Sequence, residues 1–525
     1  MNKAPLIVLA FCLLISISAC SLFFSDFKGT NNDIKGNVVI HLSSQNSRSF
    51  EKPSSIPSFG SVIFTLHKGA ESFDITRYNK NADNSYSIEV PAGEYDYISF
   101  AAKTSPGYLL GEVVGKSTNS APLNIKESGQ GASSSIYIEI EPSGENRRLA
   151  VPYWDSFSNW LFYAIEGLEK ETEGQGLPLG GTFPPYTTAD QYGRFYVIDD
   201  GCIAHCENFG QPIAYVNVSG IDSPGFNQEG LFFFYDETLG DKLFITYKSV
   251  GGGYNKIGWV SWDEVEEEYA LTPLEVSGAN TDHWDITRIV ADKVGNDTYV
   301  YVVDAGNTNI TYKGNYYSHL PVLRRLKLEG STLNDAGSKH FFDFLDSEIN
   351  FLEDPAPGSF PLGNDYLCHI TDITVINNKI YALLAYQIYM EDDDTPCYPY
   401  TGVLLEIDPE AFVNGPSGKV KYSYHYEPGM YGNYKSKVLD ENTESRRNEE
   451  FLNGYSEYFG SRFLGSNFDD DKNYLYILDT GGFYSSGFID ASNCFNRVMG
   501  IPLPFGPNDK FEGPGFYQSG VGFEG

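Results

Sequence analysis

Residues 294–306, VGNDTYVYVVDAG, carry the pattern that most narrows the possible folds of this chain. A Gly-Asn-Asp turn leads into a strand in which every position from Tyr299 to Val303 is apolar or aromatic. Such a strand is buried on both faces, and sheets of that kind are usually covered by helices. No segment nearby has a strong helical period over a useful length, so we expect other sheets to cover this one on both sides.

The same plan recurs along the second part of the chain: a turn, an apolar strand, and often an Asp followed by Gly. A further strand follows each copy, and such recurring strand pairs indicate a repeat architecture. Stacked propeller blades bury both faces of every sheet. We therefore predict a β-propeller over residues 151–525, with five to seven blades and six favoured. The other copies are QYGRFYVIDDG (191–201), the divergent KLFITYKSVGGG (242–253), INNKIYALLAY (376–386) and DDKNYLYILDTGG (470–482).

The end of the first strand in these copies resembles a Tyr-Val-x-Asp-x-Gly edge that recurs in six-bladed propellers of the NHL and related groups. The segment 376–386 lacks both the Asp and the Gly. The matching pairs are Asp199 with Gly201, Asp304 with Gly306, and Asp479 with Gly481.

A separate β-block precedes the propeller. Residues 36–142 contain short apolar runs, rich in β-branched and aromatic residues, with Gly, Pro, Asn and Ser turns between them. Ile138 and Ile140 alternate with acidic residues, as a half-buried strand requires. The block predicts a β-sandwich of immunoglobulin-like or prealbumin-like type, so the fold class is all-β. Residues 90–100 resemble a Pro-x-Gly-x-Tyr edge of prealbumin-like modules, through Pro91, Gly93 and Tyr95.

Residues 1–19 have the pattern of a signal peptide. Lys3 is followed by an apolar core, Leu6 to Ile17, that is shorter than the roughly 20 residues of a spanning helix. The segment Ile17-Ser18-Ala19-Cys20 resembles the lipobox of bacterial lipoproteins. That resemblance implies cleavage before Cys20 and a diacylglycerol of the palmitate type on its thiol, followed by a tether over residues 20–35.

The lipoprotein resemblance also implies a location. The chain is expected in the bacterial cell envelope, held on the membrane by its lipid anchor. In enterobacterial lipoproteins an Asp after the acylated cysteine suggests retention in the inner membrane. Ser21 stands there instead, which favours the outer membrane.

Export makes disulfides chemically permissible. The spacing of the cysteines suggests two disulfides, one that closes a tight loop and one that joins the two ends of an insertion. Because the number of cysteines is odd, at least one thiol is not in an intrachain disulfide. The candidate pairs are Cys202 with Cys206 and Cys368 with Cys397, with Cys494 as the remaining cysteine.

Zinc is the alternative for the first of these cysteine clusters. Cys202, His205 and Cys206 offer three ligands within five residues, and His369 could supply a fourth. No Cys-x-x-Cys or His-x-x-x-His elsewhere supports that site, so we expect a disulfide or an ordinary loop.

A second segment of the sequence suggests a calcium site. Asp469, Asp471 and Asn473 have the spacing of a calcium loop, but Tyr474 and Thr480 stand where an EF-hand needs Gly and Glu. A solvated turn between strands explains these residues more simply. We therefore expect no bound cofactor.

The net charge of −34 argues against a nucleic-acid partner, because phosphate-backbone binding relies on Lys and Arg. The favoured function is binding or scaffolding at the envelope through the propeller loops, with an unidentified protein or glycan as ligand. The alternative is a propeller hydrolase or lactonase that uses a divalent metal held in the channel. In that case Asp199, Asp304 and Asp479 are candidate ligands, although each could instead cap the turn after its strand.

Replacing Cys20 tests the lipid anchor. A Cys20→Ala variant should lose its partitioning into the detergent phase, because two or three acyl chains are what hold such a protein on a membrane. Phase separation of cell extracts measures this. Unchanged partitioning would refute the lipidation.

Overall fold

The computed structural model describes the chain between residues 35 and 516, with gaps. The longest gaps are 45–55, 174–185, 344–366, 388–400 and 427–461. The described residues are nearly all β-strand, with a single short helix among them, α2 (Ala411–Asn414). None of the described helical structure has the length and apolarity to cross a bilayer.

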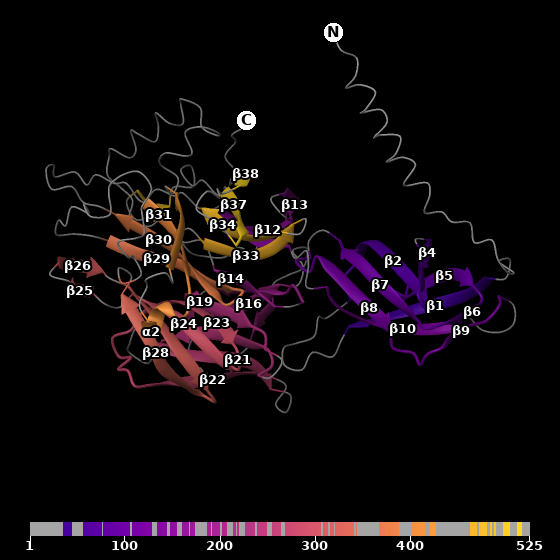
Figure 1. The fold of residues 1–525 in the computed structure, drawn as a ribbon, viewed down its shortest axis with the longest axis horizontal. Helices are drawn as coiled ribbons and strands as arrows, with labels where there is room; N and C mark the ends of the chain where they lie inside the picture. Colours follow the sequence, from indigo (N-terminus) through magenta and orange to yellow (C-terminus); the bar gives the residue numbers. More distant parts are fainter. Residues whose placement is uncertain are drawn as a thin grey trace, which may run out of the picture. The chain divides into compact units, whose positions relative to one another are not determined.

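Two compact units emerge from the contacts between residues. The first comprises the described residues within 35–43, 62–101 and 115–140, and the second comprises the rest, including 102–114. Figure 1 colours the first mainly indigo to purple and the second magenta to yellow. The boundaries 36–142 and 151–525 stay predictions.

The first unit is one eight-stranded sheet with strand order β3-β2-β7-β8-β10-β1-β5-β4, and β6 and β9 pair separately. Its strands are β1 (Lys35–Ser44), β2 (Phe59–Lys68), β3 (Glu71–Ile75), β4 (Tyr78–Lys80), β5 (Tyr86–Pro91), β6 (Gly93–Tyr95), β7 (Tyr97–Thr104), β8 (Glu112–Ser117), β9 (Leu123–Ile125) and β10 (Ser134–Pro142).

One phenylalanine shows how this sheet closes. Phe64 on β2 is fully buried, and its ring centroid lies 6.0 Å from that of Tyr78 on β4 and 5.5 Å from that of Tyr86 on β5. Because β2 and β4 lie near opposite ends of the strand order, the sheet folds over itself around one core. The predicted sandwich is therefore made from a single continuous sheet. The alternation predicted at Ile138 and Ile140 is confirmed, since both side chains are buried.

The second unit contains six antiparallel meanders along the described chain, which we call sheets one to six; the third and fourth are parts of one nine-stranded sheet. The first sheet contains β11 (Leu149–Trp154), β12 (Trp160–Glu166) and β13 (Glu169–Glu173); the second contains β14 (Thr187–Ala189), β15 (Phe195–Asp199), β16 (Cys202–Cys206) and β17 (Ala214–Val216); the third contains β19 (Phe226–Phe234), β20 (Lys242–Tyr247), β21 (Lys256–Asp263) and β22 (Glu268–Ser277). The fourth contains β23 (Ile286–Val294), β24 (Asp297–Asp304), β27 (Val322–Glu329) and β28 (Thr332–His340); the fifth contains β29 (Leu367–Ile376), β30 (Lys379–Gln387), β31 (Thr401–Ile407) and β32 (Val420–Tyr426); the sixth contains β33 (Arg462–Asp469), β34 (Lys472–Asp479), β37 (Arg497–Leu503) and β38 (Glu512–Phe516).

Further strand pairings extend or join these sheets. A parallel pair, β22 with β28, joins the third and fourth sheets along their edges. The remaining short strands are β18 (Val218–Ser219), which pairs with β22, and the hairpins β25 (Thr308–Tyr312) with β26 (Asn315–His319) and β35 (Tyr484–Ser485) with β36 (Phe488–Ile489).

The first strands of the six sheets form a ring. Strand β14 contacts β19, β19 contacts β23, β23 contacts β29, and β29 contacts β33. Strand β33 in turn contacts β11, so the last sheet meets the first, and residues of β11 and β14 border one common cavity. A closed series of meanders with their first strands at the centre is a β-propeller. The predicted all-β propeller is confirmed, and six is the number of sheets in its described part.

The burial on both faces predicted for residues 299–303 is confirmed for Val300 to Val303, whereas Tyr299 is only half-buried. Val300 and Val302 pack against Phe244 and Trp259 of the third sheet in one apolar cluster. The third sheet is covered on its other side by the second, where Tyr196 and other second-sheet side chains share a cluster with residues of the third. On the opposite face of the fourth sheet Tyr301 and Val303 are also buried, and the ring centroid of Tyr301 lies 5.9 Å from that of Phe412 on the short helix α2. Neighbouring sheets therefore cover most of the apolar faces, and α2 adds one helical turn of cover.

The copy at residues 376–386 begins with a tight turn made of two asparagines. Asn377 and Asn378 have φ angles of 51° and 59° and connect β29 to β30. Two consecutive residues with positive φ make the type I′ turn that suits a tight hairpin, and asparagine tolerates that conformation well.

Asp292, on the fourth sheet, is partly buried, and only one of its two carboxyl oxygens has a hydrogen-bond partner among the described residues. Asp292 accepts a hydrogen bond from the backbone N–H of Lys293 through Oδ1, whereas its Oδ2 is buried with no partner among the described residues. Burial raises the pKa of Asp292 to about 6, and the Lys293 N–H lowers it only in part. Tyr299 lies directly opposite on β24, with Tyr301 and the guanidinium of Arg325 further along the same face.

Asp292→Asn should make the protein more stable at neutral pH. The wild-type fold favours the protonated acid, so its free energy of unfolding falls as the pH rises from about 4 to about 6 and is level above that. The variant should lack this fall and gain about 1 kcal/mol at pH 7, after discounting for the partial exposure of the group. Urea denaturation between pH 4 and 8 measures the difference. A stability gap that does not change with pH contradicts the assignment.

Candidate binding site in the propeller channel

Five of the six sheets line one cavity of about 330 Å³. Because the first strands of these sheets form the ring, a cavity that touches so many of them lies in the central channel of the propeller. We call it the channel cavity. Its described lining comprises Leu109, Arg148, Leu149, Ala150, Tyr186, Thr187, Thr188, Ala189, Phe195, Leu231, Phe232, Phe233, Arg288, Ile289, Val290, Asp372, Ile373, Thr374, Val375 and Ile376.

Two side chains from the fourth and fifth sheets meet there with one that directly precedes the second sheet. The guanidinium of Arg288, on β23, lies 3.4 Å from the ring centroid of Tyr186, which precedes β14. Its Nε lies 3.5 Å from Oδ1 of Asp372 on β29, and the two side chains are only 6% and 8% exposed. The third sheet separates the second from the fourth around the ring, so the contact between Arg288 and Tyr186 is made at the channel. We call these three residues the crossbar.

Two β-bulges place the charged members of the crossbar. The pairing register of β23 shifts between Ile286 and Arg288, and that of β29 shifts between Ile370 and Asp372. A bulge inserts an extra residue and re-aims the side chain after it, which is why bulges are frequent beside functional sites. Neighbouring blades therefore carry opposite charges at equivalent positions.

The sequence contains a signal for this pair that the spacing of motifs does not reveal. Ile-Thr-Arg-Ile at 286–289 and Ile-Thr-Asp-Ile at 370–373 repeat each other with the charge reversed. A charged residue inside an otherwise apolar strand is seldom buried unless it is paired. These two residues, with Tyr186, are the site residues missed by sequence reasoning.

A second guanidinium lines part of the cavity wall. Arg148 is 2% exposed, and its Nη1 donates to Oγ1 of Thr104 and to the carbonyl oxygens of Ser105 and Tyr108. Its Nη2 donates to the carbonyl oxygen of Thr104. Arg148 thus binds the backbone of residues 104–108, next to Leu109 in the lining.

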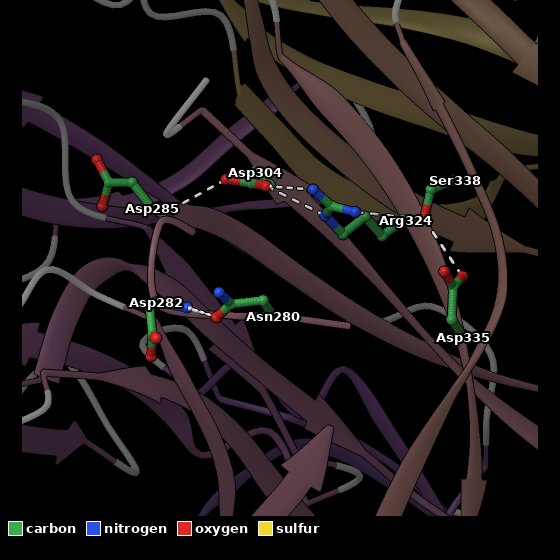
Figure 2. A network of polar contacts seen from close by, with 7 residues as sticks. All are labelled: Asn280, Asp282, Asp285, Asp304, Arg324, Asp335 and Ser338. Atoms are coloured by element: carbon green, nitrogen blue, oxygen red, sulfur yellow. Dashed lines mark hydrogen bonds and ion pairs between the residues drawn. The ribbon is translucent and has the colours of Figure 1, made fainter. Parts of the chain in front are cut away.

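Asp304, a candidate channel ligand, is part of a different network (Figure 2). It is 1% exposed; its Oδ1 accepts the backbone N–H of Asp285, and its Oδ2 accepts Nε and Nη2 of Arg324 at 3.1 and 2.7 Å. The same guanidinium lies 4.2 Å from the ring centroid of Trp284 and reaches Ser338. Asp304 therefore ties three strands of one blade together and is absent from the cavity lining.

The other two aspartates of the repeat are described only at the backbone. Asp199 lies opposite Cys202 at the end of β15, and Asp479 lies opposite Arg497 at the end of β34. The three predicted positions are thus equivalent within their blades, as the repeat implied.

The expected tight loop between Cys202 and Cys206 is replaced by a strand, and neither cysteine is disulfide-bonded in the structure. Four residues of strand separate their Cα atoms by about 13 Å. A disulfide needs Cα atoms within about 7 Å, so the two cannot pair with each other. Strand alternation also directs His205 to the opposite face from both thiols, where it stacks on Tyr196, which removes the three-ligand zinc arrangement.

The remaining candidates are described in part or not at all. Asp469 and Asn473 flank the turn between β33 and β34, which agrees with an ordinary hairpin. Among the described residues, no group of three His, Cys, Asp or Glu side chains is placed to hold a metal ion. Of Cys368 the backbone alone is described, on β29 opposite Tyr386; Cys20, Cys397, Cys494 and Asp471 lie outside the described residues.

Comparison with known proteins yields structural likeness only. No family model and no curated protein matches the chain. Similar solved structures include an exo-1,5-α-L-arabinanase from a bovine ruminal metagenomic library, at 9% identity and a TM-score of 0.32, covering 64% of this chain and 99% of that one. A thermostable family-43 glycoside hydrolase is 11% identical with a TM-score of 0.37, covering 64% and 94%. The major allergen Mala s 1 of Malassezia sympodialis is 11% identical with a TM-score of 0.21, covering 64% and 86%. Likeness at this level carries no conclusion about activity.

Replacing Asp304 should destabilise the fourth sheet. Asp304→Asn leaves the Arg324 guanidinium beside a neutral partner, and removing one member of a buried pair costs about 3 kcal/mol. Asp297→Asn is the matched control. Oδ1 of Asp297 lies 3.1 Å from Nζ of Lys327, but the side chain of Asp297 is 45% exposed, and exposed ion pairs contribute only about 0–1 kcal/mol to stability. Denaturant unfolding, with and without added calcium, measures both. A purely structural role of Asp304 would be contradicted if both variants lost the same free energy of unfolding, or if added calcium changed the loss in Asp304→Asn.

Proposed function

We propose that this chain is a lipid-anchored protein of the bacterial cell envelope that binds a ligand in its propeller channel. The Ile17-Ser18-Ala19-Cys20 segment supports the anchor, and Ser21 favours the outer membrane. The single observation that carries the binding role is the channel cavity. It is lined by five sheets and falls at the lower end of the volumes typical of small-molecule sites.

The chemistry of the lining favours binding over hydrolysis. Its described part contains one carboxylate, Asp372, and that group is ion-paired with Arg288. Glycoside hydrolysis ordinarily uses two carboxyl groups with separate roles, an acid and a nucleophile or base. A hydrolase or lactonase with a divalent ion in the channel remains the alternative function. The acidic net charge supports a protein or glycan ligand rather than a nucleic acid.

The chain from Ser21 onward, purified in soluble form, separates the two functions. We expect it to carry no stoichiometric calcium or zinc in elemental analysis and to be inert towards a broad panel of esters, lactones and glycosides. It should nevertheless bind at least one component of an envelope glycan or protein array, because a preformed cavity binds ligand without catalysis. Tyr186→Ala should weaken that binding at least tenfold, because Tyr186 is part of the crossbar. Bound metal together with turnover would establish the enzyme instead, and no ligand on either array would refute the binding role.

A further inference from the structure

The crossbar points to the chemical class of the ligand. We infer that the channel cavity binds a neutral, polyhydroxylated molecule, one or two sugar rings in size, whose hydroxyl groups contact Arg288 and Asp372. This inference rests on the proposed function and specifies the ligand of the same site.

The charge balance of the crossbar excludes ionic ligands. The side chains of Arg288 and Asp372 are both almost completely buried. Nε of Arg288 lies 3.5 Å from Oδ1 of Asp372, so the two charges compensate each other. An anion would enter beside the carboxylate, a cation would enter beside the guanidinium, and a buried charge without compensation is costly. The other guanidinium in the described lining, that of Arg148, directs N–H groups to the oxygen atoms of residues 104–108 instead. A neutral ligand leaves this balance intact.

The hydrogen-bonding character of the pair selects hydroxyl groups. A guanidinium can only donate hydrogen bonds, and an ionised carboxylate can only accept them. A hydroxyl group does both, so two adjacent hydroxyls can accept from Arg288 and donate to Asp372 side by side. Thr187, Thr188 and Thr374 add hydroxyl groups to the lining. A ligand with only hydrogen-bond donors would bond only to Asp372, and one with only acceptors would bond only to Arg288.

The apolar part of the lining completes the match. Leu149, Ile289 and Ile373 come from three sheets, and the aromatic ring of Phe232 joins them. A sugar presents hydroxyl groups at its edge and C–H groups on its ring faces, so it can contact polar and apolar walls together. A cavity of about 330 Å³ leaves room for one or two such rings and excludes a folded partner.

A paired ligand panel tests the inference. The mature lipoprotein, in a detergent without a sugar headgroup, is titrated with neutral sugars (glucose, galactose, arabinose, maltose, cellobiose) and with glucuronate and galacturonate. We expect at least one neutral sugar to bind, and glucuronate and galacturonate to bind at least tenfold more weakly than glucose and galactose. Preference for the acids, or no binding by either series, overturns the inference.

An isosteric change in the crossbar supplies the second measurement. Asp372→Asn keeps the shape but removes the negative charge, so neutral-sugar binding should weaken about 10- to 100-fold, as expected for a lost hydrogen bond to a charged group. The preference should also shift at least tenfold towards the uronates, because Arg288 is then uncompensated. Thermal melting confirms that the variant is folded. Glu89→Gln, in the exposed pair with Lys35 on the first unit, is the matched control and should leave both affinities unchanged.

The outcomes separate this inference from the proposed function. If Asp372→Asn weakens binding without changing the preference between neutral and acidic sugars, the crossbar is structural and the inference fails while the binding role stands. If the protein binds an anionic array component through Tyr186, the site is real and its ligand class is wrong. If it binds nothing on any array, the proposed function itself fails.

Discussion

Burial of sheet faces against neighbouring sheets is the constraint on which this structure depends. Val300 and Val302 on one blade need Phe244 and Trp259 on the next, because a strand with two apolar faces cannot leave either in water. Each sheet therefore requires a neighbour on both sides. A row of sheets has two unprotected ends, whereas a ring has none, and the contact between β33 and β11 removes those ends.

The ring has a second consequence, because it brings together residues that are far apart in the chain. Tyr186, Arg288 and Asp372 belong to blades two, four and five, yet they meet in the channel. Each blade contributes its first strand at the centre, so equivalent positions of successive blades become neighbours. A charge reversal between two copies of the Ile-Thr-x-Ile segment is then sufficient to make an ion pair between blades.

Two buried ion pairs of the described propeller differ in their surroundings. Asp304 and Arg324 join strands within a blade, and the aromatic ring of Trp284 covers their guanidinium. Arg288 and Asp372 instead border a cavity. Well-packed apolar residues of similar volume are often as stable as a buried ion pair, so a pair of this kind contributes little net stability. The position of this pair beside the cavity is the basis of the proposed ligand binding.

The all-β class and the repeated, buried strand were predictable from the amino-acid sequence. These follow from local patterns of apolar residues and turns, which depend on neighbours along the chain. The separation of Cys202 and Cys206 became evident once the segment between them was seen to be a strand, because an extended backbone sets that distance. The contacts of Arg288 with Asp372 and Tyr186 depend on the three-dimensional fold, since bulges and ring closure bring these residues together across almost 200 residues, a distance that no local pattern records.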